Sequence, residues 1–154
     1  MVNTEQVRQM IVNESVLIDK QGIVSLYEAI HKMMGFGLGG LLYRAGKIGG
    51  HQGAKALAER LGLRGDALIE ALLVAFNAAR WGEAELERGP DPWTLRVRDS
   101  VLGQHLRNKK PVCHPIAGYW AGFLEVALGR TVEVKEVACM ALGAPECEFK
   151  IHLK

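Results

Sequence analysis

The three cysteines of this chain all lie in its last third, and they constrain the fold more than any other feature of the sequence. They are Cys113, Cys139 and Cys147, and Glu136 precedes the second of them by three residues. Three thiolates and one carboxylate form a set of four ligands that a Zn²⁺ ion can bind tetrahedrally, whereas three cysteines cannot all pair as disulfides. We therefore predict a metal site at these four residues, which requires a fold that brings separate parts of the chain together.

The two later cysteines flank a cluster of turn residues, Gly143 to Glu146, between two β-like runs. A hairpin with arms at 131–142 and 146–153 would place Cys139 across from Cys147. The other two ligands must then reach the hairpin from elsewhere in the fold.

The spacing of Glu136 and Cys139 conflicts with a regular strand. Residues an odd number of positions apart point to opposite faces of a sheet, so both can bind one ion only if the strand is irregular. We expect a bulge near Val137 and Ala138. Two alternatives stay open: the cysteines are simply buried apolar side chains, or Cys139 and Cys147 form a disulfide. A buried Glu136, however, needs a partner, and a cation supplies one.

The rest of the sequence predicts an α+β fold with an antiparallel sheet of about four strands. The strands fall into two consecutive hairpins, and helices should cover one face of the sheet. We predict a single domain over residues 1–154, of which 1–22 form a weakly structured N-terminal segment. Two helices are expected in the middle of the chain, one over 66–80 with Asp66 as its N-cap and one over 115–128 that ends at Gly129. Strands are expected over 84–87 and 93–98, followed by a polar loop to Lys110.

A further helix is expected at the start of the chain. Ser25 and Glu28 form a capping-box signature, which predicts a helix beginning at Leu26. Glycine is frequent between Gly35 and Gly53, and each glycine in a helix interior costs up to about 1 kcal/mol relative to alanine. The helix therefore either continues to about Arg60 or is interrupted between Gly35 and Gly40.

These glycines require a compensating interaction. One explanation is the close approach of another helix. The other is an enclosed pocket for a small, largely apolar and aromatic molecule, since missing side chains beside methionines and aromatic rings leave adaptable space. The residues predicted to line such a pocket are Met33, Met34, Gly39, Gly46, Trp93 and Tyr119.

Several C-terminal runs resemble the 4-vinyl reductase domain, also called the hydrocarbon-binding family. They are Pro111 to Cys113, Gly118-Tyr119, Lys135 to Cys139, and then Gly143 and Cys147. The family includes the sensor domains of aromatic-responsive bacterial transcription activators, and its fold is similar to that of one class of subunits in the vesicle-tethering TRAPP complex.

The resemblance implies a structural zinc ion. The aromatic sensors bind zinc through a Cys, a Glu and two further Cys, which match Cys113, Glu136, Cys139 and Cys147. His114, next to Cys113, is an alternative ligand in place of Glu136. Four protein ligands leave no open position for water, so such a site is structural rather than catalytic.

The match to the sensors is incomplete in the ligand pocket. The sensors hold the hydroxyl of their ligand with a His and a Trp. In this chain Trp93 lies in the matching segment but out of register, and no histidine aligns. The resemblance therefore does not extend to phenol itself.

We expect a stand-alone, zinc-containing domain that binds and senses a small hydrophobic or aromatic molecule without catalysis. One alternative is an accessory protein or enzyme in the reduction of a tetrapyrrole vinyl group, and another is a TRAPP-subunit-like interaction scaffold. The resemblance and the large apolar content also predict a homodimer, with close subunit contact at the glycine-bearing helices.

Composition excludes other classes of protein. A net charge of +2, with acidic and basic residues interspersed, provides no basic patch for direct nucleic-acid binding. No apolar run reaches the length of about 18 residues that a membrane span needs. An odd number of thiols without an export signal indicates a cytoplasmic protein.

Overall fold

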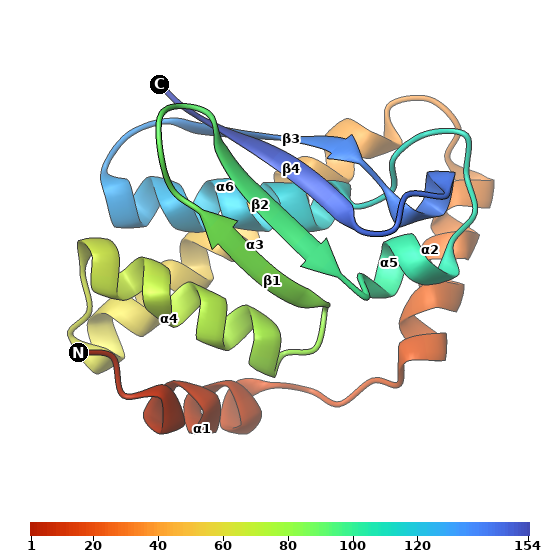
Figure 1. The fold of residues 1–154 in the computed structure, drawn as a ribbon. Helices are drawn as coiled ribbons and strands as arrows, with labels where there is room; N and C mark the ends of the chain where they lie inside the picture. Colours follow the sequence, from red (N-terminus) through yellow and green to blue (C-terminus); the bar gives the residue numbers. More distant parts are fainter.

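The computed structural model describes residues 1–154 and has the predicted α+β architecture, a four-stranded antiparallel sheet with helices against one face (Figure 1). Both predicted hairpins form, and antiparallel pairing of their inner strands joins them into the order β1-β2-β4-β3. The strands are β1 (Glu83–Glu87), β2 (Trp93–Arg98), β3 (Val132–Ala138) and β4 (Cys147–Leu153). The helices are α1 (Thr4–Glu14), α2 (Lys20–Met33), α3 (Leu38–Leu61), α4 (Gly65–Ala78), α5 (Val101–His105), α6 (His114–Leu128) and the 3₁₀ helix η1 (Met140–Leu142).

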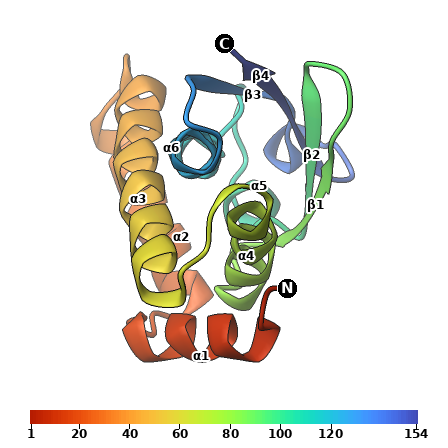
Figure 2. The ribbon, with the colours of Figure 1, turned by 90° about the vertical axis from the view of Figure 1, so that its left-hand side faces the viewer.

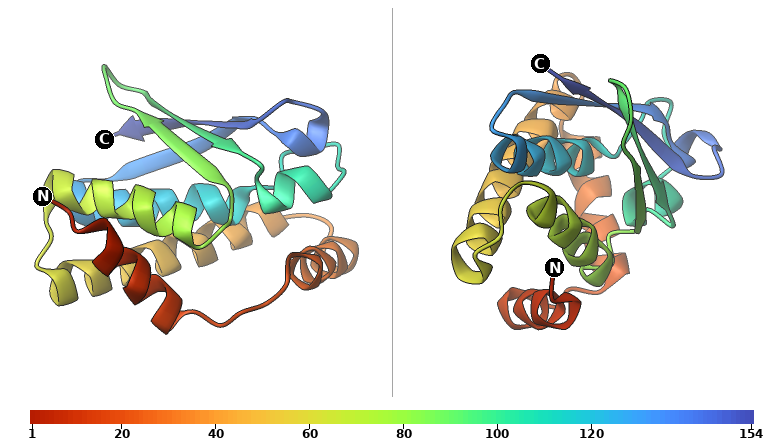
Figure 3. Two further views of the ribbon diagram at one scale, coloured as in Figure 1. Left: turned by 60° about the horizontal axis from the view of Figure 1, so that its bottom comes forward. Right: turned by 60° about the vertical axis from the view of Figure 1, so that its left-hand side comes forward.

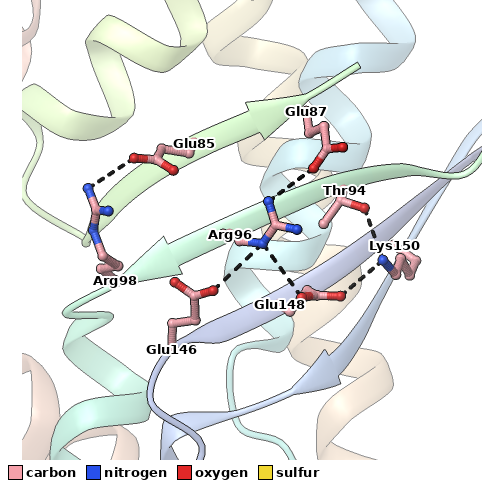
Figure 4. A network of polar contacts seen from close by, with 8 residues as sticks. All are labelled: Glu85, Glu87, Thr94, Arg96, Arg98, Glu146, Glu148 and Lys150. Atoms are coloured by element: carbon pink, nitrogen blue, oxygen red, sulfur yellow. Dashed lines mark hydrogen bonds and ion pairs between the residues drawn. The ribbon is translucent and has the colours of Figure 1, made fainter. Parts of the chain in front are cut away.

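The two faces of the sheet have opposite characters. Along β2, Trp93, Leu95 and Val97 are buried as predicted and face the helices, which lie on one side of the sheet (Figure 2). The other face carries ion pairs of Arg96 with Glu87 on β1 and Glu148 on β4, and Lys150 pairs with Glu148 within β4 (Figure 4). Helices therefore need to cover only the apolar face.

Helices α3 and α6 pack closely against each other, because both carry glycines where they meet (Figure 2). Gly46 and Gly50 on α3, and Gly118 and Gly122 on α6, each have the Cα directed at the other helix. A Cβ at any of the four would overlap a backbone carbonyl oxygen of the opposite helix. Close approach of a second helix, the first of the two explanations considered for the glycines, thus accounts for Gly46 and Gly50.

The break in the glycine-rich region follows the interrupted alternative. Helix α2 ends at Met33, and α3 begins at Leu38 after Gly37, whose positive φ of 84° places it in the left-handed region. A single continuous helix to Arg60 does not form.

The predicted start of α2 is wrong. Asp19 accepts a hydrogen bond from the backbone N–H of Gly22 at 2.8 Å, so the helix begins at Lys20 rather than at Leu26. The Ser25 capping box lies inside the helix, because an aspartate earlier in the chain already satisfies the free amides.

The N-terminal segment also contains more structure than its polar sequence suggested. Helix α1 packs along α4 at the bottom of the molecule, and its Val7 is almost fully buried (Figure 3). The β-like run Val16 to Ile18 is not a strand, and its side chains are exposed in the connection between α1 and α2.

Further boundaries differ from prediction. The first arm of the final hairpin, expected to run to residue 142, ends as β3 at Ala138, because Met140–Leu142 form the 3₁₀ helix η1. Helix α4 begins at Gly65 with Arg64 as the N-cap, so Asp66 lies in the first turn, where it pairs with Arg88 at 2.7 Å. The stretch expected to be a polar loop up to Lys110 contains the short helix α5. Helix α6 ends at Gly129 as predicted, and no helix has the length and apolar character needed to cross a membrane.

Candidate metal centre

The four predicted metal ligands meet where the final hairpin contacts the start of α6. Cys113 is the N-cap residue of α6, Glu136 lies on β3, Cys139 follows β3 directly, and Cys147 opens β4. One ligand atom from each lies within 4.8 Å of all the others. We call these four residues the thiol cluster. It includes Glu136 and not His114, the alternative ligand.

The predicted irregularity in β3 is present and explains how two close ligands share one side. The register between β3 and β4 shifts between Glu136 and Ala138, and Val137 is displaced toward solvent with 55% of its surface exposed. This bulge reorients the strand so that Glu136 and Cys139 both reach the thiol cluster.

The contacts inside the thiol cluster leave one acceptor without a partner. The sulfurs of Cys113 and Cys147 lie 3.7 Å apart, and the Cys113 N–H donates to Oε2 of Glu136 at 3.0 Å. The Met140 N–H donates to the sulfur of Cys147 at 3.4 Å. Oε1 of Glu136 is buried and has no hydrogen-bond partner, which is costly for a carboxylate. A cation bound by the three sulfurs and this oxygen would satisfy it, so the donor set fits a metal ion.

The electrostatics of the thiol cluster also call for a positive charge. Burial, followed by the proximity of the Cys139 thiolate, raises the pKa of Glu136 to about 8. Hydrogen bonds from Cys113 and Cys147 lower the pKa of Cys139 and make it the preferred thiolate. The hydrogen bond with Cys113 lowers the pKa of Cys147, but the one with Cys139 and burial outweigh it and raise that pKa to about 12. Without a cation the four groups therefore cannot all ionise together.

Helix α5 contributes a wall of the site that the sequence did not predict. Ser100 is fully buried, caps α5 by accepting from the Gly103 N–H, and lies with its hydroxyl 3.3 Å from the sulfur of Cys113. At Gly103 a Cβ would lie 2.7 Å from the sulfur of Cys147. The available signal was Ser100 itself, a good N-cap residue after a strand.

All three cysteines are free thiols in the structure. The disulfide between Cys139 and Cys147, considered as an alternative, is therefore not formed. Simple burial alone leaves the unpartnered oxygen of Glu136 unexplained.

The residues predicted to line one ligand pocket are divided between two cavities. Met34 and Gly39 border a cavity of about 700 Å³ beside the start of α6. Gly46 and Tyr119 border a second one, of about 450 Å³, which is lined by residues further along α3 and α6. The two cavities share no lining residue.

The other two predicted pocket residues line neither cavity. Met33 is 84% exposed at the end of α2. Trp93 packs under the sheet, where its indole N–H donates to the carbonyl of Gly89 at 3.0 Å and the Arg88 guanidinium lies over its ring. The structure therefore does not bring the six residues together.

The 450 Å³ cavity, hereafter the apolar cavity, lies among α1, α2, α3, α4 and α6. Ten of its 14 lining residues are hydrophobic. Burial alone raises the pKa of Tyr27 and Tyr119, so both phenols are neutral groups that can donate or accept a hydrogen bond. The lining includes Ile11, Tyr27, Leu42, Phe76, Trp81 and Tyr119.

An antiparallel sheet backed by helices, with three thiols and a carboxylate gathered at its last hairpin, defines an α+β domain of the class that the C-terminal sequence resembles. Residues 93–153 match the family model of the 4-vinyl reductase domain, which confirms the predicted resemblance. The matched part of the chain runs from β2 to β4 and includes the whole thiol cluster.

Solved structures with the same fold cover nearly the whole chain. The phenol-responsive sensory domain of the transcription activator PoxR, solved with phenol, has a TM-score of 0.77 at 15% identity over 99% of this chain and 91% of that one. A vinyl-4-reductase family protein from Methanocaldococcus jannaschii has a TM-score of 0.66 at 22% identity, over 98% of this chain and 92% of that one. Trafficking protein particle complex subunit 3 from Naegleria fowleri, covalently bound to palmitic acid, has a TM-score of 0.66 at 19% identity, over 99% of this chain and 95% of that one. At these identities the likeness is one of fold.

Relatives in sequence come from the same archaeon. One uncharacterized protein of Methanocaldococcus jannaschii is 34% identical over 79 residues, which are 50% of this chain and 34% of the relative. Another is 26% identical over 136 residues, 85% of this chain and 76% of the relative. The chain thus spans about a third of the length of the first relative.

Proposed function

We propose that this protein is a zinc-containing domain that binds and senses a small hydrophobic or aromatic molecule in the apolar cavity. The observation that carries the proposal is the cavity itself, an apolar space of about 450 Å³ among five helices. Small-molecule sites are concave, of several hundred cubic ångströms, and mostly apolar with a few polar groups. The apolar cavity has this composition, and Ser15, Tyr27 and Tyr119 are the residues with hydroxyl groups among its lining.

The shape of the lining favours an aromatic ligand over a flexible chain of the same volume. Tyr27, Phe76, Trp81 and Tyr119 place rings from four different segments around one space. Rings pack well edge to face or offset against another ring, and a phenolic hydroxyl can bond with that of a ligand.

The comparisons support a binding role. The PoxR domain is phenol-responsive and was solved with phenol, and the trafficking complex subunit holds palmitic acid. Two proteins of this fold thus accommodate small apolar molecules, although these ligands differ in shape.

We assign a structural Zn²⁺ to Cys113, Glu136, Cys139 and Cys147. Thiolate-rich sets of four suit zinc, and four protein ligands leave no position for a reacting water, so we propose no catalysis at this site. A reducing cytoplasm would keep the three thiols available for the metal.

Elemental analysis and melting curves test the zinc assignment. Protein purified without chelator should hold about one zinc per chain, and Cys147→Ser should lose it and melt at a markedly lower temperature. The control is Ser25→Ala, on an exposed part of α2. Zinc-free protein that melts as high as the parent would exclude a structural metal.

Native mass spectrometry and thermal shift test ligand binding. Phenols, polycyclic hydrocarbons and fatty acids should be screened for a rise in melting temperature, and a co-purified ligand should appear in the native spectrum. Ala45 lies at an exposed edge of the apolar cavity, so Ala45→Trp should block binding while the fold is kept. Ala29→Trp, exposed on α2, is the matched control. Binding that survives Ala45→Trp would place the ligand elsewhere.

A second role, self-association, is favoured by a specific surface. Apolar side chains are exposed along α2 and both of its connections, and we call this the α2 surface: Val16, Leu17, Ile18, Leu26, Met33 and Phe36. Four of its side chains, those of Val16, Leu17, Met33 and Phe36, are at least 84% exposed. We therefore propose a homodimer through the α2 surface.

The location of this interface differs from the sequence-based one. The glycines expected to admit a second subunit are occupied by the contact between α3 and α6 of the same chain. Light scattering should give twice the monomer mass, and Phe36→Lys or Leu17→Lys should give the monomer mass. Ile48→Lys, also exposed and apolar, is the control on α3. A parent protein of monomer mass at tens of micromolar would contradict the dimer.

A further inference from the structure

The cavity of about 700 Å³, hereafter the basic cavity, has a different chemistry from the apolar cavity. It forms where α2 and its connection to α3 meet the segment between α5 and α6 (Figure 1). Five of its 16 lining residues are hydrophobic. Lys32, Arg107 and Lys110 line it together with one acidic residue, Glu28.

The positive charges in the basic cavity are not neutralised within the chain. Neither Lys32 nor Lys110 takes part in an ion pair, and no ion pair involves Glu28. Arg107 donates through Nη1 to the carbonyls of Gln104 and Leu106 and keeps its charge. The cavity therefore presents three cationic side chains against one carboxylate.

Two histidines lie in the same wall. Nε2 of His31 has no hydrogen-bond partner and is enclosed by protein atoms, so it is not open to the cavity. The ring of His114 lies directly against Gly39. Both imidazoles line the basic cavity.

Two residues at the start of α3, whose backbone amides are free, also line this space. The N-cap Gly37 offers no side-chain hydrogen bond, and the N–H groups of Leu38 and Gly39 have no backbone acceptor. Both residues line the cavity. Free amides and the positive end of a 24-residue helix add to the field of the cationic side chains.

We propose that the basic cavity binds the phosphate group of a small phosphomonoester. A carboxylate is best recognised by the fork of an arginine, but Nη1 of Arg107 already donates to the main chain. Two lysines act as point charges, and several separate N–H donors suit the larger charge and the three free oxygens of a phosphate. This site is independent of the ligand proposed for the apolar cavity.

Calorimetry on the full chain tests the proposal, with inorganic phosphate and phenyl phosphate as probes at low salt. Both should bind saturably, and binding should weaken as sodium chloride is added. Lys32→Gln and Lys110→Gln should each raise the dissociation constant about tenfold, since each removes a charge-assisted hydrogen bond. Lys55→Gln is the control, because it removes an exposed, unpaired lysine on α3 away from the cavity, and it should leave the dissociation constant unchanged.

Each contrary result overturns the proposal in a definite way. If benzoate bound as tightly as phenyl phosphate, the phosphate group would not be what is recognised. Either the basic cavity would then bind carboxylates, or both probes would bind through their phenyl ring in the apolar cavity. If all three lysine variants lost affinity for phosphate equally, binding would depend on the net charge of the protein and not on this cavity. Nitrogen-edited NMR adds an independent measurement, because phosphate should shift the amide signals of Leu38 and Gly39, and unmoved signals would refute the site.

Discussion

Gly50 lies at the crossing of α3 and α6, and replacing it with alanine measures how closely the two helices approach. The added Cβ would overlap the carbonyl oxygen of Tyr119 and lie 2.8 Å from the backbone nitrogen of Phe123. Both neighbours are backbone atoms of a helix, so the whole of α6 must move for the methyl group to fit.

The expected cost follows from two opposing terms. Overpacking a well-packed contact costs about 1–3 kcal/mol, whereas alanine improves helix propensity by up to about 1 kcal/mol. Because the clash is with backbone, we expect the upper part of that range, and a net loss of about 2 kcal/mol in the free energy of unfolding for Gly50→Ala.

The neighbouring glycine provides a matched control in the same helix. A Cβ at Gly49 would lie 3.6 Å from a ring carbon of Tyr119, which is ordinary van der Waals contact. Gly49→Ala should therefore raise the free energy of unfolding by up to about 1 kcal/mol. Urea denaturation at equal zinc content should separate the two variants by about 3 kcal/mol. Equal stabilities would refute the inferred closeness of α3 and α6.

Two further predictions concern contacts at the ends of helices. Glu125 accepts from Lys47 (2.7 Å), His51 (2.8 Å) and the Val132 N–H (3.1 Å), and although burial raises its pKa, these contacts lower it overall. Glu125→Gln should lower the free energy of unfolding by about 1 kcal/mol near neutral pH, as measured by urea denaturation. The difference between the two proteins should disappear as the pH falls through the folded-state pKa of Glu125, because only the ionised carboxylate is stabilised by these contacts. Asp19→Ala should destabilise α2 by about 1 kcal/mol while Ser25→Ala is nearly neutral, and the reverse order in thermal melts would restore the capping box.

The features that the sequence predicted well depend on local patterns. Alternation along Trp93, Leu95 and Val97 indicated which face of β2 is buried. The odd spacing between Glu136 and Cys139 indicated a bulge, because in a regular strand the two side chains would point to opposite faces and could not bind one ion.

The features that the sequence did not predict depend on which surfaces meet in space. The Ser25 capping box predicted the start of α2, but serine and aspartate are both favourable N-cap residues, and the structure uses Asp19. Gly46 and Gly39 are close in sequence, but the first faces a carbonyl oxygen and the second the ring of His114. One pocket was therefore predicted where the structure has two cavities without a shared lining residue. Helix α5 has only five residues, too few for a periodic pattern.

The ion pairs on the open face of the sheet also select how the strands align (Figure 4). Arg96 reaches Glu87 on β1 and Glu148 on β4, so the position of one guanidinium depends on the alignment of three strands at once. If β4 slipped by one residue, Glu148 would turn toward the helices and Phe149 toward water. Each exposed pair adds little to stability. Their arrangement instead disfavours a one-residue slip of β4, and so protects the alignment on which the thiol cluster depends.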